Sequence, residues 1–505
     1  MIKRIACIGG GPGGLFFSTL VKRAMPDAEV VLFERNRASD AFGFGVVFSD
    51  ATLRAIDEAD PVLRDGLREH GRHWDSIEVW IKGERPTFSG NGMAAIHRKT
   101  LLRLLQEDAI STGVDLRFET YVTDLRELDD FDVVVAADGA NSATRERLRG
   151  DLGHDVETAQ AKFIWFGSTH MFDGLTFIHK KSEHGNFAVH AYPVSDSIST
   201  FIVEADEQTW RRAGLDEFDV TQPPGASDLK TKAYLEQLFG DDIPGLELVT
   251  NNSRWGNFRT RRTDSWHTGN VAFLGDAVHT AHFSVGAGTK MAMEDAIVLA
   301  RELASHPDDV GAAFVRYQDE RRAKVARIQT AAGPSLYWWE HFADYYDAFE
   351  PWQFAFHFFS RSIPLEKIRE RDADFAATTE ERWAQRHGSD PLRTPLTIGD
   401  VTFADRALAW DREAQVLRHP TTGVEVQVSD GTVVDAGATD AQSVEIPRGS
   451  SFALVSGGTD VARVAIAETI ELAFKVPAIV VAPESDPETL VLSGRASAIV
   501  DDGAA

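Results

Sequence analysis

The stretch that most constrains the fold of this chain is Ile5–Gly14, which reads IACIGGGPGG. Its apolar first part, Ile5–Ile8, predicts a buried strand, and the glycines after it predict a tight turn that leads into a helix. Glycine lets the backbone approach a phosphate closely, and the start of the helix offers free N–H groups to an anion. The sequence therefore predicts a site for a nucleotide diphosphate at Gly9, Gly11, Pro12, Gly13 and Gly14.

The residues after this turn predict a complete βαβ unit. Apolar side chains recur at helical spacing from Phe16 to Val21, and Ala28–Phe33 predicts a second buried strand. Glu34 follows that strand, twenty residues after Gly14, where a carboxylate can accept the ribose hydroxyls of an adenosine. Its neighbour Arg35 belongs to the same predicted site. A purely structural glycine turn is the alternative, and the βαβ context favours nucleotide binding.

Composition limits the other classes of function. With 505 residues the chain is long enough for two or three domains, and its net charge of −26 argues against nucleic acid or an anionic membrane as a partner. The one cysteine, Cys7, cannot form an internal disulfide, which suits a reducing cytoplasm. No apolar leader or 18-residue apolar run occurs, so we expect a cytoplasmic protein without a membrane span.

Two more predicted strands end in glycine and aspartate. Phe131–Ser142 contains Asp138-Gly139, and Asn270–His279 contains Gly275-Asp276. The carboxyl ends of parallel strands are the usual place for nucleotide contacts in an open α/β sheet. A further glycine loop with a helix start follows the last strand and comprises Gly286, Ala287, Gly288 and Thr289.

Two segments between these strands are further candidates for the same site. The loop Phe42–Ser49 contains Gly45 and Val46, and its alternating glycines would let the backbone lie flat against a planar ligand. Arg98 starts a predicted helix and could pair bidentately with a phosphate. The alternatives are an ordinary glycine turn and a solvated arginine.

Short β-rich runs between residues 162 and 204 predict an antiparallel sheet inserted after the nucleotide-binding half. Because side chains alternate along a strand, His190 and Tyr192 should share one face of it. Such a sheet can cover a substrate. A structural role is the alternative for either residue alone.

The three strand-end motifs, in this order and spacing, resemble those of the single-component FAD-dependent aromatic hydroxylases over roughly residues 1–375. Five other segments look similar to the branch of that family that hydroxylates salicylyl-CoA and 2-aminobenzoyl-CoA, and to the violacein-pathway hydroxylases: Phe42–Ser49, Lys162–Asp173, His190–Tyr192, Ser199–Glu204 and His282–Ala292. Phe283 stands where most of the family has proline, a departure that this branch shares.

The resemblance implies a bound FAD, NADH or NADPH as the reductant, and O2. It implies hydroxylation of an aryl-CoA thioester, most closely salicylyl-CoA to gentisyl-CoA, through a flavin C4a-hydroperoxide. His190, Tyr192 and His282 are candidates for deprotonating the phenol. The FAD residues that it implies are Gly9, Gly11, Pro12, Gly13, Gly14, Glu34, Arg35, Gly45, Val46, Arg98, Asp138, Gly139, Gly275, Asp276, Gly286, Ala287, Gly288 and Thr289.

Other functions stay open at this point. The substrate could be 2-aminobenzoyl-CoA, or a free indole or other aromatic compound. A third possibility is a non-catalytic binding protein of the GDP-dissociation-inhibitor type, which shares the fold with the glycine-rich turn. Such a protein would not need the predicted flavin-binding loops at Gly275-Asp276 and Gly286–Thr289.

A CoA thioester carries several phosphate charges, and a strongly acidic protein needs local cations to bind it. Arg259, Arg261 and Arg262 lie close together in sequence and are the candidate landing points, with a solvated surface run as the alternative. We expect a monomer or a homodimer.

The predicted fold class is α/β. A Rossmann-like FAD-binding domain is expected from residues 1–160 and 251–375, with the antiparallel substrate sheet inserted as residues 161–250. Residues 391–505 alternate strands with a helix and predict a small C-terminal α/β domain of unknown role.

Overall fold

The computed structural model describes residues 1–49, 53–219, 221–222 and 225–501. It divides into two compact units, of which unit 1 is Met1–Glu78 with Asn91–Glu340 and unit 2 is Val79–Gly90 with His341–Ala505. The three-domain division expected from the sequence subdivides the chain differently and stays a prediction.

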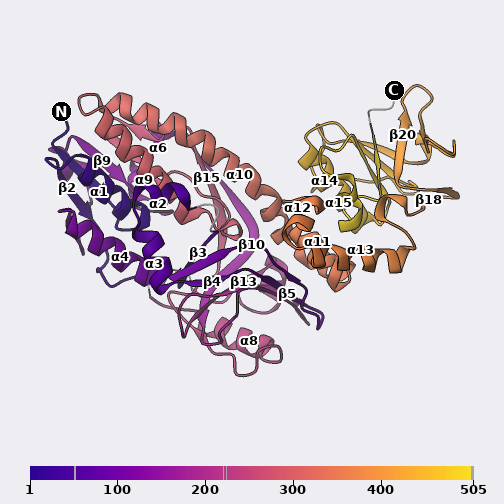
Figure 1. The fold of residues 1–505 in the computed structure, drawn as a ribbon, viewed down its shortest axis with the longest axis horizontal. Coiled ribbons are helices and arrows are strands. Elements are labelled where there is room, and N and C mark those ends of the chain that lie inside the picture. Colours follow the sequence, from indigo (N-terminus) through magenta and orange to yellow (C-terminus); the bar gives the residue numbers. More distant parts are fainter. Residues whose placement is uncertain (50–52, 220, 223–224, 502–505) are drawn as a thin grey trace. The chain divides into compact units, whose positions relative to one another are not determined.

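Unit 1 is built on a six-stranded sheet with the order β16-β17-β9-β1-β2-β8. Two of its strands, β2 and β9, are labelled near α1 in Figure 1. All neighbouring strands are parallel except β16 and β17. The predicted βαβ unit at the N-terminus is confirmed as β1, α1 and β2. The bounds are β16 His267–Thr268, β17 Val271–Phe273, β9 Val133–Ala136, β1 Arg4–Ile8, β2 Glu29–Phe33 and β8 Asp115–Arg117.

The central strands of this sheet are apolar after their first residues because helices cover them. Four of the five residues of β1 are buried, including Cys7. Helix α1 (Pro12–Ala24) packs against α9 (Gly288–Ser305) and α4 (Arg98–Ser111). The other helices in or entering unit 1 are α2 Arg54–Ala59, α3 Val62–His70, α5 Ala143–Arg147, α6 Arg149–Leu152, α7 Glu207–Arg212, α8 Leu229–Phe239 and α10 Val310–Ala348.

The inserted antiparallel sheet of unit 1 has the strand order β14-β10-β13-β12-β11, and β15 also pairs with β10. The four strands predicted between residues 162 and 204 are confirmed. The first begins earlier than predicted, since its N-terminal half pairs with β15, a strand that the sequence did not predict. The bounds are β10 His154–Ser168, β11 Leu175–Ser182, β12 Gly185–Pro193, β13 Ser199–Ala205, β14 Leu248–Val249 and β15 Gly256–Thr263.

A small antiparallel sheet, β3-β7-β4, contains Gly45 and Val46. The segment Phe42–Ser49, predicted as a loop, is therefore a strand from Gly45 onward, because its backbone pairs with β7. Its bounds are β3 Gly45–Ser49, β7 Met93–His97 and β4 Arg72–Trp74. Helix α4 starts at Arg98, directly after β7, so this sheet positions the backbone of Arg98.

Unit 2 contains a seven-stranded sheet, β22-β21-β20-β26-β25-β24-β23, whose last five strands are parallel. The α/β character predicted for the C-terminal part is confirmed. The strands are β18 Leu396–Ile398, β19 Val401–Phe403, β20 Ala407–Asp411, β21 Val416–Arg418, β22 Glu425–Gln427, β23 Thr432–Asp435, β24 Ala453–Ser456, β25 Ala478–Val481 and β26 Ala498–Val500. The helices are α11 Pro351–Phe359, α12 Leu365–Arg371, α13 Ala373–His387, α14 Asp460–Thr469 and α15 Pro487–Ser493, and β5 (Ile77–Ile81) and β6 (Thr87–Phe88) fall in or beside the segment Val79–Gly90.

Among the residues that the structure describes, no helix is both long and apolar enough to cross a bilayer. The same residues include no group of three or more His, Cys, Asp and Glu that could hold a metal ion.

Candidate functional site

Three strand ends of the parallel sheet meet at one cavity of about 140 Å³. Gly9 follows β1, Glu34 follows β2, and Asp138 follows β9. The three strands are neighbours in the sheet, so these residues, each a candidate for nucleotide binding in the sequence analysis, lie at one cavity. The cavity is lined by Ile8, Gly9, Gly11, Phe33, Glu34, Arg35, Asn36, Thr120, Tyr121, Val122, Ala137, Asp138, Gly139, Asn141, Ala143, Thr144 and Arg147.

The structure requires glycine at different positions of the first turn for different physical reasons. Gly9 has a φ of +112°, and a Cβ atom there would lie 2.4 Å from the carbonyl oxygen of Ala137. A Cβ on Gly14 would lie 2.1 Å from the carbonyl oxygen of Gly9. Gly11 has no atom within 4 Å of the place where its Cβ would stand. Its backbone therefore faces open space at the start of α1, as a diphosphate site requires.

Two carboxylates border this cavity. Glu34 accepts hydrogen bonds from the amide of Gly10 at 2.7 Å and from the amide of Asn36 at 2.8 Å. Oδ2 of Asp138 accepts one from the amide of Thr144 at 3.1 Å, whereas its buried Oδ1 has no partner among the described residues. Glu34 also lines a second, smaller cavity beside Arg98. These groups fit the adenosine diphosphate half of FAD.

A larger cavity of about 320 Å³ continues from the start of α1. Its aromatic side consists of Phe163, Trp165 and Phe258, whose rings each contact that of Phe283, together with Phe283 itself and Tyr192. The rest of the lining, called the polar side here, is mostly glycine-rich backbone, and its Leu274 and Ala292 lie beside Gly13. The polar side comprises Pro12, Gly13, Gly14, Gly45, Val46, Val47, Arg98, Ala137, Gly139, Leu274, Gly275, Asp276, Thr280, Ala281, Gly286, Ala287, Gly288, Thr289 and Ala292. This arrangement suits a flavin ring with an aromatic substrate beside it.

Asp276 and Arg98 influence each other across the polar side of this cavity. The surrounding protein raises the pKa of Asp276 above its ordinary value, and the charges of His279 and Arg98 oppose that shift. Burial lowers the pKa of Arg98, which the charge of Asp276 opposes. The cavity therefore presents one carboxyl and one guanidinium group, which can meet the ribityl hydroxyls and the phosphates of a dinucleotide.

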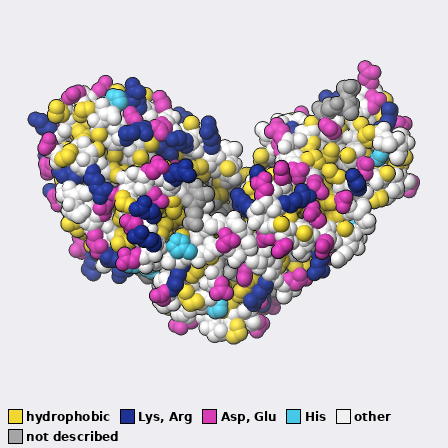
Figure 2. Space-filling model, viewed as in Figure 1, with side chains coloured by type: hydrophobic (Ala, Val, Ile, Leu, Met, Phe, Trp, Pro, Cys, Tyr) yellow, Lys and Arg dark blue, Asp and Glu magenta, His cyan; other side chains and the backbone are white. Residues whose placement is uncertain are grey.

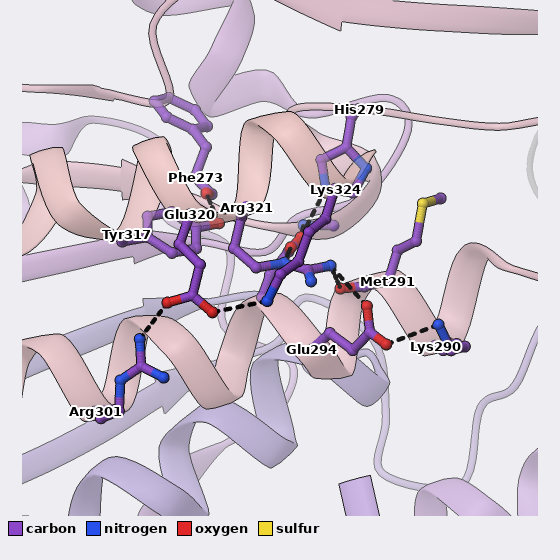
Figure 3. A network of polar contacts seen from close by, with 12 residues as sticks. Phe273, His279, Lys290, Met291, Glu294, Arg301, Tyr317, Glu320, Arg321 and Lys324 are labelled. Carbon is purple, nitrogen blue, oxygen red and sulfur yellow. Dashed lines mark hydrogen bonds and ion pairs between the residues drawn. The ribbon is translucent and has the colours of Figure 1, made fainter. Parts of the chain in front are cut away.

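A buried polar network holds the turn that carries Asp276 (Figure 3). Asp295 of α9 accepts hydrogen bonds from the amide of Gly275 at 3.0 Å, from Nε2 of His279 at 2.7 Å and from Nε of Arg321 at 2.7 Å. Burial alone would raise the pKa of Asp295, but His279 and Arg321 outweigh it and hold that pKa below its usual value. The turn, α9 and α10 are thus joined at one carboxylate.

The network extends along the helices to side chains nearer the solvent (Figure 3). Arg321 also pairs with Glu294 at 2.9 Å, and Glu294 pairs with Lys290 at 2.7 Å. Glu320, which is one-third exposed, pairs with Arg301 and Lys324. The sequence analysis did not single out Asp295, because it lies twenty residues beyond Gly275 on a helix whose other buried residues are mainly apolar.

We expect Asp295→Asn to lower the thermal stability of the apoprotein and to weaken FAD binding. Removing one partner of a buried ion pair costs about 3–5 kcal/mol, because the partner charge stays buried. Melting temperature by circular dichroism and the FAD dissociation constant measure the two effects. Glu320→Gln is the matched control, since its ion pairs are exposed and should contribute less than about 1 kcal/mol. An unchanged apoprotein melting temperature for Asp295→Asn would contradict the role assigned to this network.

The three residues predicted as catalytic candidates lie at or behind the aromatic side of the larger cavity. Tyr192 lines it, and burial raises the pKa of its hydroxyl to about 12. His190 shares the face of Tyr192 on β12, as predicted, but it is buried behind Phe283 with ring centroids 5.5 Å apart. His282 is also buried and bonds the hydroxyl of Ser284 through Nδ1 at 2.7 Å.

The three arginines predicted to receive CoA lie on β15, where residues two apart share a face. Arg259 and Arg261 therefore share one face, and the charge of Arg259 acts on Arg261, which is buried near Arg145 and Asp276. Arg262 points to the other face and pairs with Glu157 at 3.0 Å, and both Arg259 and Arg262 are exposed. The sequence analysis did not predict β15, so it could not anticipate this separation.

Comparison with known proteins agrees with this geometry. Residues 130–332 match the FAD binding domain family. A salicyloyl-CoA 5-hydroxylase of a Streptomyces species is 53% identical over 98% of this chain and 99% of the relative. A 3-hydroxy-4-methyl-anthranilyl-(aryl-carrier protein) 5-monooxygenase of Streptosporangium sibiricum is 33% identical over 68% of this chain and 90% of the relative.

A solved structure shares the fold. The p-nitrophenol 4-monooxygenase of Pseudomonas putida matches with a TM-score of 0.57 at 17% identity, covering 74% of this chain and 97% of that protein. NAD(P)H and O2 are the usual co-substrates of such monooxygenases. Since the relative with 53% identity spans nearly the whole of both chains, and the strand-end cavities fit a flavin dinucleotide, the chain belongs to the FAD-dependent aromatic hydroxylases.

Proposed function

We propose that this enzyme hydroxylates salicylyl-CoA para to the phenol and releases gentisyl-CoA, using FAD, NAD(P)H and O2. The observation that carries the proposal is the 53% identity, along almost the whole chain, to a relative named for the 5-hydroxylation of salicyloyl-CoA. The aromatic side of the larger cavity supports it, because Phe163, Trp165 and Phe258 can hold a planar ring. A cytoplasmic location is part of the proposal.

FAD would occupy the two cavities described above, the one at the strand ends and the larger one at the start of α1. The glycine turn and Glu34 would hold its adenosine diphosphate, Arg98 and Asp276 its phosphates and ribityl chain, and Gly286–Thr289 its ring. When bound, FAD takes two electrons from NAD(P)H and delivers one oxygen atom of O2 to the substrate.

The chain's own residues have three tasks in this reaction. The aromatic side chains exclude water and orient the ring. Tyr192 stays protonated near neutral pH because its pKa is about 12, so it acts as a hydrogen-bond donor. His190 and His282 are the candidates for accepting the phenol proton, which makes the ring carbon para to the oxygen more nucleophilic.

The CoA part must overcome the charge of the protein, which is −26. Acidic and basic side chains are interspersed on the face drawn in Figure 2, so a phosphate needs a local cation. Arg259 is exposed on β15 and is the best placed of the three predicted arginines, with Arg262 contributing after release from Glu157. Arg261 is too deeply buried to receive a phosphate from solvent.

We expect free salicylate to be a poor substrate, with a kcat/KM at least tenfold below that of salicylyl-CoA. Contacts with the CoA provide binding energy that positions the ring. The KM of the thioester should rise with salt, because exposed charge contacts are screened within about 8–10 Å near physiological ionic strength. Nicotinamide oxidation with a panel of aryl-CoA thioesters and free acids measures both.

Arg259→Ala should raise the KM for salicylyl-CoA and flatten its salt dependence. Arg126→Ala, at an exposed arginine that pairs with Asp124, is the control and should change neither. Equal kcat/KM for salicylate and salicylyl-CoA, without salt dependence for the thioester, would overturn the assignment of a CoA substrate.

A further inference from the structure

A buried carboxylate stands on the substrate-facing side of the antiparallel sheet. Residues that pair directly across neighbouring strands point to the same face. Glu204 pairs with Phe163 and with Ala188, and His190 pairs with Ile202, which pairs with Trp165. Glu204 and His190 therefore share the face whose aromatic residues line the flavin cavity.

The two side chains form a close contact. His190 Nε2 lies 2.6 Å from Oε1 of Glu204, and the exposed fractions of the two residues are 4% and 1%. Trp339 of α10 covers the imidazole with ring centroids 4.0 Å apart, and Phe177 flanks it at 5.1 Å. Glutamate is almost never buried so completely unless it is paired.

The other titratable groups around the pair come from three elements. His282, in the loop before α9, and Glu340 of α10 act on Glu204 with opposite signs. His179 of β11 lies near His190, and burial lowers its pKa to about 3, so it stays neutral. Burial raises the pKa of Glu204 to about 7, which the charge of His282 opposes.

Stability does not explain this pair. Replacing a buried ion pair by apolar residues of similar volume is often neutral or stabilising, and the same face already carries Phe163, Trp165 and Phe177. A histidine and a carboxylate in this position can instead take part in a proton transfer.

We propose that Glu204 is a positioning residue that keeps His190 as the proton acceptor for the phenol of the substrate. The inference rests on the function proposed above. Glu204 accepts a hydrogen bond from the Nε2–H group of His190, which holds the imidazole in the tautomer whose lone pair is on Nδ1. The phenol O–H bond breaks, its proton moves to Nδ1, and the carboxylate stabilises the imidazolium that forms. Phe283, which is half-buried between the cavity and His190, has to move for this contact.

Glu204→Gln tests the proposal, because glutamine keeps the shape and cannot carry the charge. We expect kcat with salicylyl-CoA to fall about a hundredfold, with less than a threefold change in KM, because His190 without the carboxylate is a weaker general base. In the wild type, we expect activity to fall at low pH as the pair takes up a proton. Without the carboxylate, burial should lower the pKa of His190, so this acidic limb should move to lower pH by at least about one unit.

A bound ligand gives a readout that does not depend on turnover. The probe is 5-nitrosalicylyl-CoA, whose nitro group blocks the position to be hydroxylated and whose phenolate is coloured. Titrating the holoenzyme complex by difference absorbance should give a higher apparent pKa for the bound phenol in Glu204→Gln than in the wild type, by at least about one unit.

Two further variants separate this role from a structural one. Glu204→Asp keeps the charge and should restore part of kcat and of the bound phenolate. His179→Asn alters a buried histidine of the same sheet face and should leave the acidic limb and the phenol pKa in place. An unchanged pH profile and phenol pKa in folded Glu204→Gln would overturn the proposal. Failure of the wild type to oxidise salicylyl-CoA, with the probe pKa still shifted, would instead count against the substrate.

Discussion

Gly9→Ala should prevent the chain from folding into a flavin-binding protein, whereas Gly11→Ala should leave the fold intact and weaken FAD binding alone. At Gly9 the backbone has a φ of +112°, and the new Cβ would lie 2.4 Å from the backbone oxygen of Ala137. Strain of this kind costs about 1–3 kcal/mol, and the backbone clash adds about 1–3 kcal/mol.

At Gly11 the backbone is ordinary for an L-residue, with a φ of −75°. The added methyl group meets no protein atom within 4 Å and would face the cavity. Soluble yield and melting temperature report on the fold, and the FAD dissociation constant reports on the site. The account is contradicted if Gly9→Ala retains the wild-type melting temperature, or if Gly11→Ala binds FAD as well as the wild type does.

Glu34→Ala should weaken FAD binding at least tenfold. Its carboxylate is the predicted acceptor of the ribose hydroxyls, and a hydrogen bond to a charged group contributes about 1.5–3 kcal/mol. The same carboxylate fixes the amide of Gly10 at 2.7 Å, so the glycine turn should also loosen. Fluorescence titration of the apoprotein with FAD measures the change.

Glu29→Ala is the matched control for this variant, because Glu29 starts the same strand and pairs with Arg4 on the exposed surface. It should bind FAD normally. An unchanged dissociation constant for Glu34→Ala would remove this residue from the FAD site.

Local patterns predicted the nucleotide half of the fold well. The βαβ unit was readable because the apolar runs that form β1 and β2 are separated by a glycine turn and an amphipathic helix. The shared face of His190 and Tyr192 was predictable from the two-residue period of a strand. Each of these features depends only on residues that are neighbours in the chain.

Features that depend on strand pairing could not be predicted in this way. Glu204 contacts His190 because β12 and β13 pair in one particular register. The alternation of residues within a single strand does not determine that register. The separation of Arg259 from Arg262 depends on β15, whose sequence is polar and contains few β-branched residues. Asp295 reaches the amide of Gly275 only after α9 folds back over the turn.

The most direct test of the proposed activity is the fate of molecular oxygen. Purified holoenzyme is incubated with salicylyl-CoA, NADH or NADPH, and ¹⁸O2, and the product is analysed by mass spectrometry and by fragmentation of the ring. The account predicts one labelled oxygen atom per product, placed para to the phenol, with one nicotinamide oxidised for each product formed. Oxidation of the nicotinamide without a labelled ring product, or labelling of free salicylate at the same rate, would contradict it.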